Sequence, residues 1–466
     1  MKNTLLSTLI ASLSLSERQE ARKWLQSPLH NERKSSLRLF NHLEEFHFEL
    51  GLPPERERAF RTLFPEQEYD DQVLRLECSY LLQNLEQWLR WRSWSKAPQD
   101  QSLLLSAYRN LGLPKHFHRA AQKAQRLQER SLRRDHRFHY QQYLIEEELY
   151  LFQSRAGRGR PLNLQQQEDA LQKAILSYKL RLACLSLAHQ RVSGAQYEIA
   201  MLPEVLQLAT TSTYADEPAI AVYYHAYLMY QDVDNEAAFR QFEQLLFTHL
   251  PKFPDQEGRD LVLLGINFCI RQINKKGEAY FAEALSLYRQ GLDQDLLRED
   301  GFLSAFTFSN IVIIAIRSGE LDWVQGFIEQ YRRQLEPTRR QAIYALNAAR
   351  IAYQQGQHRD AMLLLHQFSD RDFIHTLSAK IIQLKIFYEG GDFQLLAAHI
   401  KNTRAYLRRV KTDSYHKKIY VNIFSLTDQL MKLPPYDQEK RVALRQQIID
   451  TEPLTEKEWL LEQSMD

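Results

Sequence analysis

The chain has 466 residues and a formal net charge of +2, from 60 Lys and Arg against 58 Asp and Glu. This near balance excludes a general attraction of the whole molecule to polyanions. Glycine and proline number 15 each, and the chain is rich in Leu, Gln, Glu, Arg and Ala, which favour helices. We therefore expect an all-α protein that is long enough to bury a large core.

The cysteine content and the hydropathy of the chain indicate in which cellular compartment the protein works. Cys78, Cys184 and Cys269 are widely spaced, odd in number and without a Cys-x-x-Cys pair. Such a set is not typical of a disulfide framework or of a zinc site, so we expect a reducing cytoplasm. No run approaches the roughly 18–20 apolar residues that a membrane helix needs, and we expect no membrane partner.

Residues 1–97 are expected to form an N-terminal region of short helices. Residues 1–16 carry Lys2 and then leucines at helical spacing. This spacing favours a retained amphipathic first helix, and a weak secretory signal is the alternative. Ser16 with Gln19 has the pattern of a capping box that opens the next helix.

Short sequence words in this region, and a few beyond it, resemble those of one family. They are Leu15-Ser-Glu-Arg-Gln-Glu-Ala, Ser27-Pro-Leu-His-Asn31, Leu63-Phe64-Pro65, Tyr69-Asp-Asp71, Lys179-Leu-Arg-Leu-Ala-Cys184, Met201-Leu-Pro-Glu-Val-Leu206 and Glu458-Trp-Leu-Leu461. The family consists of uncharacterised bacterial proteins of similar length that are described only as tetratricopeptide-like. The resemblance implies a helical-repeat fold and no activity, so it transfers no functional residue to this chain.

Residues 98–160 are expected to form a long, partly basic helical segment that ends in a Gly/Arg loop. Between Lys115 and Arg137 the segment holds eight Lys and Arg and only two acids. The loop that follows, residues 154–161, is the one stretch rich in glycine and arginine. Because such loops commonly connect folded parts, it is the best candidate for a domain boundary.

The basic segment also permits a nucleic-acid-associated interpretation. Its candidate contacts are Arg133, Arg134, Arg137, Arg158 and Arg160, because arginine is attracted to phosphates and to narrow minor grooves. The cations alternate with Gln and Ala, however, and we do not expect them to form one stripe on a helix. A solvated basic helix is the favoured interpretation, and nucleic acid is the alternative partner.

Residues 161–433 contain the strongest pattern, a series of helix–turn signals. The turn glycines Gly277, Gly319, Gly356 and Gly391 are 42, 37 and 35 residues apart, with apolar helical segments on both sides. A period of this size is typical of stacked helical hairpins, and the repeat around Gly356 resembles the tetratricopeptide (TPR) pattern. We expect an α-α superhelix, a TPR-like solenoid, with capping helices in residues 434–466.

The small positions of that pattern are Ala349 and Ala361, where the two helices of a hairpin cross closely. Val324 replaces the second alanine in the repeat before. In the repeat after, either Leu395 or Leu396 replaces it, so the register of the repeats is left open there.

Polar residues recur at one offset before the turns. Asn310 and Asn347 precede their glycine by nine residues and Asn267 by ten, and Arg271 and Arg350 lie one turn further along. In the TPR pattern this position faces the concave surface, where an amide can both donate to and accept from a peptide. We expect these five residues to form a partner-binding groove. The alternative is that the asparagines satisfy local or interhelical hydrogen bonds.

The chain carries no motif of catalysis or of cofactor binding, such as a phosphate-binding loop, a nucleophile elbow or a zinc-protease helix. His136 and His139 lie three apart and could meet His116 and His118 around a transition metal. Polar residues on a basic helix explain these histidines better. We therefore expect no catalytic, cofactor-binding or metal site, and no enzyme.

The sequence thus predicts a non-enzymatic scaffold or adaptor that binds a protein or peptide on the concave surface of helical repeats. We expect a cytoplasmic bacterial monomer whose partner the residues do not identify. The alternative is a nucleic-acid-associated regulatory protein that uses the basic segment 115–161.

Overall fold

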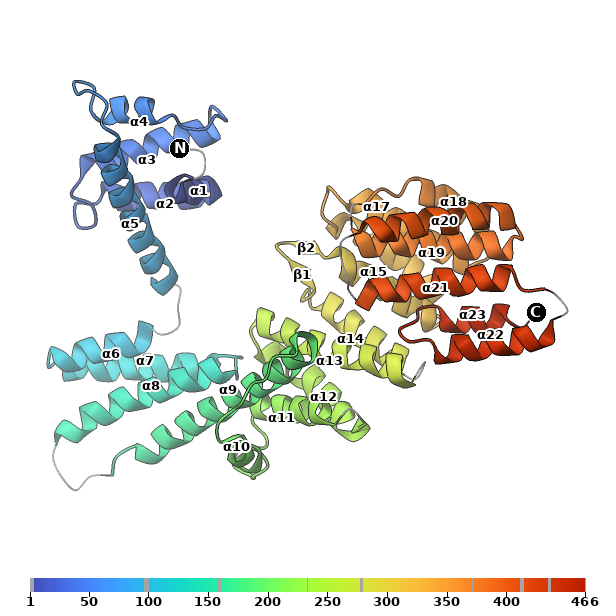
Figure 1. Ribbon diagram of the computed structural model, residues 1–466. Coiled ribbons are helices and arrows are strands. Elements are labelled where there is room, and N and C mark those ends of the chain that lie inside the picture. Colours follow the sequence, from blue (N-terminus) through green and yellow to red (C-terminus); the bar gives the residue numbers. More distant parts are fainter. Residues whose placement is uncertain are drawn as a thin grey trace. The chain divides into compact units, whose positions relative to one another are not determined.

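The computed structural model describes residues 4–95, 100–156, 161–232, 234–276, 280–370, 372–410, 415–434 and 437–465. Within these ranges the chain is helical apart from its connections and one short β-hairpin, so the all-α expectation is confirmed. It divides into two compact units (Figure 1). Unit 1 comprises residues 1–131 and 137–174, and unit 2 comprises residues 132–136 and 175–466.

Unit 1 contains two separate hydrophobic clusters. The first draws on α1–α5 and includes Phe40, Phe60 and Trp88, and the second draws on α6–α8 around Phe117 and Ile145. Each of the expected segments 1–97 and 98–160 therefore has a core of its own. The helices are α1 (Leu5–Ser12), α2 (Leu15–Gln26), α3 (Lys34–Phe48), α4 (Arg56–Leu63), α5 (Asp71–Ser95), α6 (Asp100–Asn110), α7 (Pro114–Arg130) and α8 (His136–Gln153).

The capping box of α2 lies two residues before the expected one. The Ser14 side chain accepts from the backbone N–H of Glu17, and the Glu17 carboxylate accepts from the N–H of Ser14 at 2.9 Å. The expectation for Ser16 and Gln19 was wrong: both pairs match the capping-box motif, but capping at Ser14 lets the helix begin two residues earlier.

The units divide inside one continuous helix, α9 (Leu164–Ser193), and not at the Gly/Arg loop. Its first turns belong to unit 1, whereas Leu176, Leu180 and Cys184 enter the large hydrophobic cluster of unit 2. Residues 157–160 of the loop lie outside the described residues. Because neither Pro nor Gly interrupts residues 164–193, no local signal marks where α9 passes from one core to the other.

Unit 2 continues with paired helices (Figure 1). They are α10 (Leu202–Ala209), α11 (Pro218–Gln231), α12 (Glu236–His249), α13 (Asp255–Lys276), α14 (Phe281–Asp293), α15 (Ala305–Arg317), α16 (Leu321–Tyr331), α17 (Arg340–Gln354), α18 (His358–His366), α19 (Phe373–Glu389), α20 (Phe393–Arg409), α21 (Tyr415–Met431), α22 (Gln438–Asp450) and α23 (Lys457–Gln463). A hairpin of β1 (Arg298–Glu299) and β2 (Phe302–Leu303), which the sequence did not indicate, separates α14 from α15.

Successive helices of unit 2 pack as hairpins, and the first helices of neighbouring hairpins also touch. The hairpins are α11–α12, α13–α14, α15–α16, α17–α18 and α19–α20. Across hairpins, α15 contacts α17, α17 contacts α19, and α19 contacts α21. We call the surface shared by α15, α17, α19 and α21 the first-helix face.

Three of the four glycine turns share one geometry. Gly319, Gly356 and Gly391 have φ of +76°, +74° and +71°. In each turn the next residue's N–H bonds back five residues, as from Gln357 to the Ala352 carbonyl at 2.8 Å. This bond closes the end of the first helix, and it needs the left-handed conformation that glycine adopts without strain. The fourth turn, at Gly277, lies outside the described residues.

Burial settles the register of the repeats. Ala349, Ala361, Val324 and Leu396 are each completely buried, whereas Leu395 is 56 % exposed. Leu396 is therefore the residue that takes the place of the second alanine. The larger Val and Leu are accommodated because adjacent side chains, and not a fixed spacing, decide how closely the helices cross.

Replacing the glycine of one turn tests this account. We expect Gly356→Ala to destabilise unit 2 by about 1–2 kcal/mol, since alanine at positive φ is strained. Gly326→Ala is the matched control, because Gly326 lies inside α16 with open space around it. The control should be neutral or stabilising by up to about 1 kcal/mol, since alanine favours a helix interior. Chemical denaturation of the two variants measures both effects, and equal midpoints would contradict the account.

Candidate functional site

The predicted groove residues differ in their accessibility. Asn267 and Asn310 are exposed, and Asn310 also hydrogen-bonds the buried hydroxyl of Tyr288. The guanidinium carbon of Arg271 lies 4.7 Å from the centre of the Tyr230 ring. Asn267 and Asn310, on α13 and α15, therefore keep polar groups that a ligand could reach, whereas Arg271 is half-buried with its Nη2 enclosed.

Asn347, by contrast, makes its side-chain hydrogen bonds to other residues of the protein. The residue is completely buried, and its Nδ2 donates to Ser309 Oγ at 3.1 Å and to the Ile343 carbonyl at 2.8 Å. Its Oδ1 accepts from Arg350 Nη1 at 2.7 Å. The interhelical role, considered above as the alternative for these asparagines, therefore describes Asn347: it joins α15 to α17.

Arg350 points its charge into an enclosed region of the first-helix face. Burial lowers the pKa of its guanidinium to about 10, although the charges of Tyr420 and of the Glu456 carboxylate raise this pKa. A guanidinium taken out of water is costly unless acceptors compensate it. Asn347 supplies one acceptor, and the negative charge that acts on Arg350 comes from the C-terminal part of the chain.

That C-terminal part, residues 452–463, lies on the first-helix face. Glu456 accepts from Lys385 Nζ at 2.9 Å, and the Nε1–H of Trp459 donates to Glu389 Oε1 at 2.7 Å. Glu458 pairs with Arg317 of α15, and the Pro453 carbonyl accepts from Asn422 of α21 at 2.8 Å. We call residues 452–463 the docked segment. Its α23 also packs beside α21 and α22 (Figure 1).

Lys385 is the centre of this contact. Its Nζ lies 4.8 Å from the ring centre of Tyr353 and 5.5 Å from that of Trp459, in addition to its ion pair with Glu456. Trp459 meets Tyr388 edge-on at 5.5 Å and is only 6 % exposed. Two aromatic rings and a carboxylate around a cation favour particular positions of the contacting groups, and not only opposite charge.

Sequence reasoning missed Lys385 and Glu389, although a signal was present. Lys385 precedes Gly391 by six residues, as Arg350 precedes Gly356, so extending the register by one repeat would have placed both cations on the same face. No such signal connects Trp459 to Glu389, because the two are 70 positions apart and belong to no common repeat.

The basic segment has a second candidate surface on α7. Its cations Lys115, Arg119, Lys123, Arg126 and Arg130 are all exposed, and within the described part of the chain none of them has an ion pair. Their spacings of four, four, three and four residues place them on one face of the helix, opposite the buried Phe117 and Ala121. The expectation that the cations form no stripe was wrong, because the intervening Gln and Ala occupy the other faces.

The cations beyond α7 are used differently. Arg133 pairs with Asp255 at 3.6 Å and donates to the Phe253 carbonyl, and the N–H of Arg134 donates to the Lys252 carbonyl at 2.9 Å. These contacts tie residues 132–136 to unit 2. Arg137 is exposed, and Arg158 and Arg160 lie outside the described residues.

Among the described residues, one group could offer three ligands to a metal ion: Asp135, His136 and Glu257, whose ligand atoms lie within 4.8 Å of one another. However, Arg181 Nε is 3.7 Å from the Glu257 carboxylate, and the Tyr223 hydroxyl donates to it at 2.8 Å. A guanidinium next to a ligand carboxylate competes with a cation, so we describe the group as an ion-pair network. His116, His118 and His139 do not belong to it.

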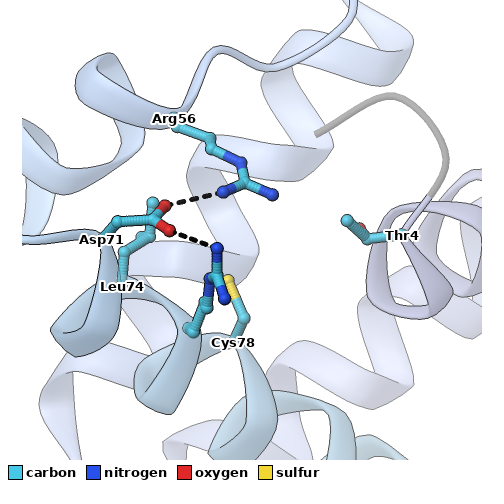
Figure 2. Close-up of a pocket in the computed structure, with 6 residues that line it drawn as sticks. Thr4, Arg56, Asp71, Leu74 and Cys78 are labelled. Carbon is cyan, nitrogen blue, oxygen red and sulfur yellow. Dashed lines mark hydrogen bonds and ion pairs between the residues drawn. The ribbon is translucent and has the colours of Figure 1, made fainter.

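A shallow pocket of about 100 Å³ in unit 1 has no catalytic group in a reactive state (Figure 2). Asp71 accepts from Arg56 and Arg75, each at 2.7 Å, and a hydrogen bond from Tyr69 leads the contacts that lower its carboxyl pKa. Burial raises the pKa of the Cys78 thiol to about 11. The thiol is therefore protonated near neutral pH, and only the thiolate is a strong nucleophile.

The role of Asn347 can be separated from that of an exposed asparagine. We expect Asn347→Ala to lower the free energy of unfolding by about 1–3 kcal/mol, since it leaves buried partners without hydrogen bonds. Asn267→Ala should change it by less than about 0.5 kcal/mol, because the residue is exposed. Thermal unfolding of both variants decides the matter. Equal stability of Asn347→Ala and the wild type would show that its amide is not structural.

Comparison of the chain with protein-family models, with curated proteins and with solved structures gives no match. Among the described residues, no helix has both the length and the apolar character needed to cross a membrane. The functional argument therefore rests on the chain's own residues, foremost the first-helix face with its docked segment, and then the stripe on α7.

Proposed function

We propose that the protein is a non-enzymatic scaffold that binds a peptide or a partner protein on a TPR-like stack of helical hairpins. Three supports come from unit 2. Three of its hairpins close with the same glycine turn, the first helices of neighbouring hairpins touch, and exposed polar residues lie along them. A surface of this kind binds extended or helical segments in many repeat proteins.

The observation that carries the proposal is the docked segment itself. Residues 452–463 contact α15 and α19 through the side chains of Glu456, Glu458 and Trp459, and the Pro453 carbonyl accepts from Asn422 of α21. The first-helix face therefore holds a polypeptide segment by the same kinds of interaction that a partner would use, namely ion pairs, an indole hydrogen bond and aromatic contacts.

A partner would extend from the docked segment towards α13, where Asn267 and Asn310 are exposed and Arg271 is half-buried beside Tyr230. We further propose a monomer in the cytoplasm. The three cysteines are unpaired, which supports a reducing compartment.

The proposal can be tested by removing those polar groups together. In pull-downs from the native host, the variant Asn267→Ala, Arg271→Ala, Asn310→Ala should lose a protein that the wild type retains, and its affinity for that purified protein should fall at least about tenfold. The matched control is Gln325→Ala, Arg359→Ala, Asn402→Ala, which removes one guanidinium and two amides from exposed positions on the second helices α16, α18 and α20.

The control variant should bind like the wild type. If the groove variant retains every partner with unchanged affinity, the partner does not use this surface and the proposed function is wrong.

A second candidate function, binding of a nucleic acid, is favoured by the stripe on α7. Five cations from Lys115 to Arg130, which have no ion pair with any described residue, extend over about 22 Å of helix, at about 1.5 Å per residue. Such a row can displace counterions from a phosphate backbone, and the resulting affinity depends steeply on salt.

Salt dependence tests the second candidate. A single-stranded oligonucleotide should bind at low salt, and Arg119→Ala, Lys123→Ala, Arg126→Ala should reduce the slope of log K against log salt by about 2. Lys401→Ala, Arg408→Ala, Arg409→Ala removes the same charge from exposed positions of α20 and should leave the slope unchanged. Absence of any retardation of DNA or RNA at low salt would rule this candidate out.

A further inference from the structure

The contacts of the docked segment define the chemistry of a ligand more narrowly than a peptide in general. Two opposite charges of α19, Lys385 and Glu389, lie one helical turn apart and meet two groups of the segment. Lys385 takes the Glu456 carboxylate, and Glu389 takes the N–H of Trp459. The acid and the indole are three residues apart, so both reach α19 from one side of a short helix.

We propose that the face formed by Tyr353, Lys385, Tyr388 and Glu389 is a docking site for a partner segment that carries a carboxylate three residues before a tryptophan. In the absence of the partner, the chain's own Glu456-Lys-Glu-Trp459 occupies the site. This inference rests on the proposed function and names the kind of partner that one part of the face takes.

The site selects against related side chains. A phenylalanine would fill the place beside Tyr388 but would remove the indole N–H from Glu389 Oε1, leaving that oxygen with the Tyr353 hydroxyl as its donor. A segment without the acid would leave Lys385, 12 % exposed, between two rings without its carboxylate. Acid and indole are therefore both required.

The docked segment also has features of an exchangeable ligand. Its helix α23 has only seven residues, too few to be stable without the face beneath it. Glu456, at its start, has φ of +54°, a left-handed conformation that is unfavourable for a residue with a side chain. Several of its contacts are ion pairs near the surface, such as Glu458 with Arg317. Trp459 and Leu460 supply the apolar anchor.

The experiment uses the full chain and a labelled synthetic peptide of residues 451–465. The wild-type protein should bind the peptide weakly, because its own segment competes at high effective concentration. The full-length variant Trp459→Ala, which empties the site, should bind at least about tenfold more tightly by fluorescence anisotropy. Trp94→Ala, an exposed tryptophan of α5, is the matched control and should bind like the wild type.

Specificity is tested in the same assay. In the Trp459→Ala protein, a further Lys385→Ala change should abolish binding. Peptides with Glu456→Gln or Trp459→Phe should bind at least about tenfold more weakly than the unchanged peptide, since each loses a charge-assisted bond. Equal affinity of the wild-type protein and the Trp459→Ala variant, or indifference of the peptide to its tryptophan, would overturn the inference.

Two further measurements keep the test decisive if Trp459→Ala fails to fold. The double variant Glu456→Gln, Glu458→Gln weakens the docked segment and keeps the buried indole, and it should bind the peptide more tightly than the wild type does. Hydrogen exchange of the wild type should show residues 452–463 opening faster than α19. Exchange of the segment only together with α19 would mean that it is a fixed part of the core, and the inference would be wrong.

The outcomes separate this inference from the proposed function. If the peptide does not bind but a partner is lost through Asn267, Arg271 and Asn310, the scaffold function stands and the assignment of this site fails. If the protein forms a dimer that requires Trp459, a second copy of the chain is the occupant, which also overturns the assignment to a separate partner.

Discussion

Three successive hairpin turns of the repeat region depend on a reversal of the backbone that glycine makes without strain. At Gly319, Gly356 and Gly391 the chain enters the left-handed region, and the next N–H returns to a carbonyl five residues earlier. Because this bond closes the first helix at a defined residue, the second helix starts from the same local geometry each time. The buried positions Val324, Ala361 and Leu396 follow at constant offsets from the turn. The first-helix face is regular because these glycine turns fix where each first helix ends.

The two candidate surfaces of the molecule differ in their physics. The first-helix face holds Lys385 between aromatic rings, where little water screens its charge and direction determines which groups fit. The stripe on α7 consists of solvated cations without partners in the described part of the chain, so its attraction is long-ranged, unspecific and sensitive to salt. A segment with an acid and an indole suits the first surface, and a phosphate backbone suits the second.

Part of the candidate site could be predicted and part could not. The offset of Arg350 from Gly356 recurs in Lys385 and Gly391, so the register alone locates both cations on one face. The stripe on α7 follows from counting residues once Pro114 is taken as the first residue of the helix. The burial of Asn347 could not be foreseen, since Asn310 has the same offset and is exposed. Their difference depends on Arg350, three residues along the same helix, and on Ser309, which meets Asn347 only when α15 and α17 pack.

The sequence by itself determined the helical class, the glycine turns at Gly319, Gly356 and Gly391, and their spacing. All of these depend on local preferences, such as helix propensity and the conformational freedom of glycine, that act over a few residues. Only the tertiary structure decided which asparagine is buried, where α9 passes from one core to the other, and that residues 452–463 lie on α19. Those outcomes depend on contacts between residues tens of positions apart. The energies of these contacts come from packing and desolvation, and they produce no repeating pattern in the sequence.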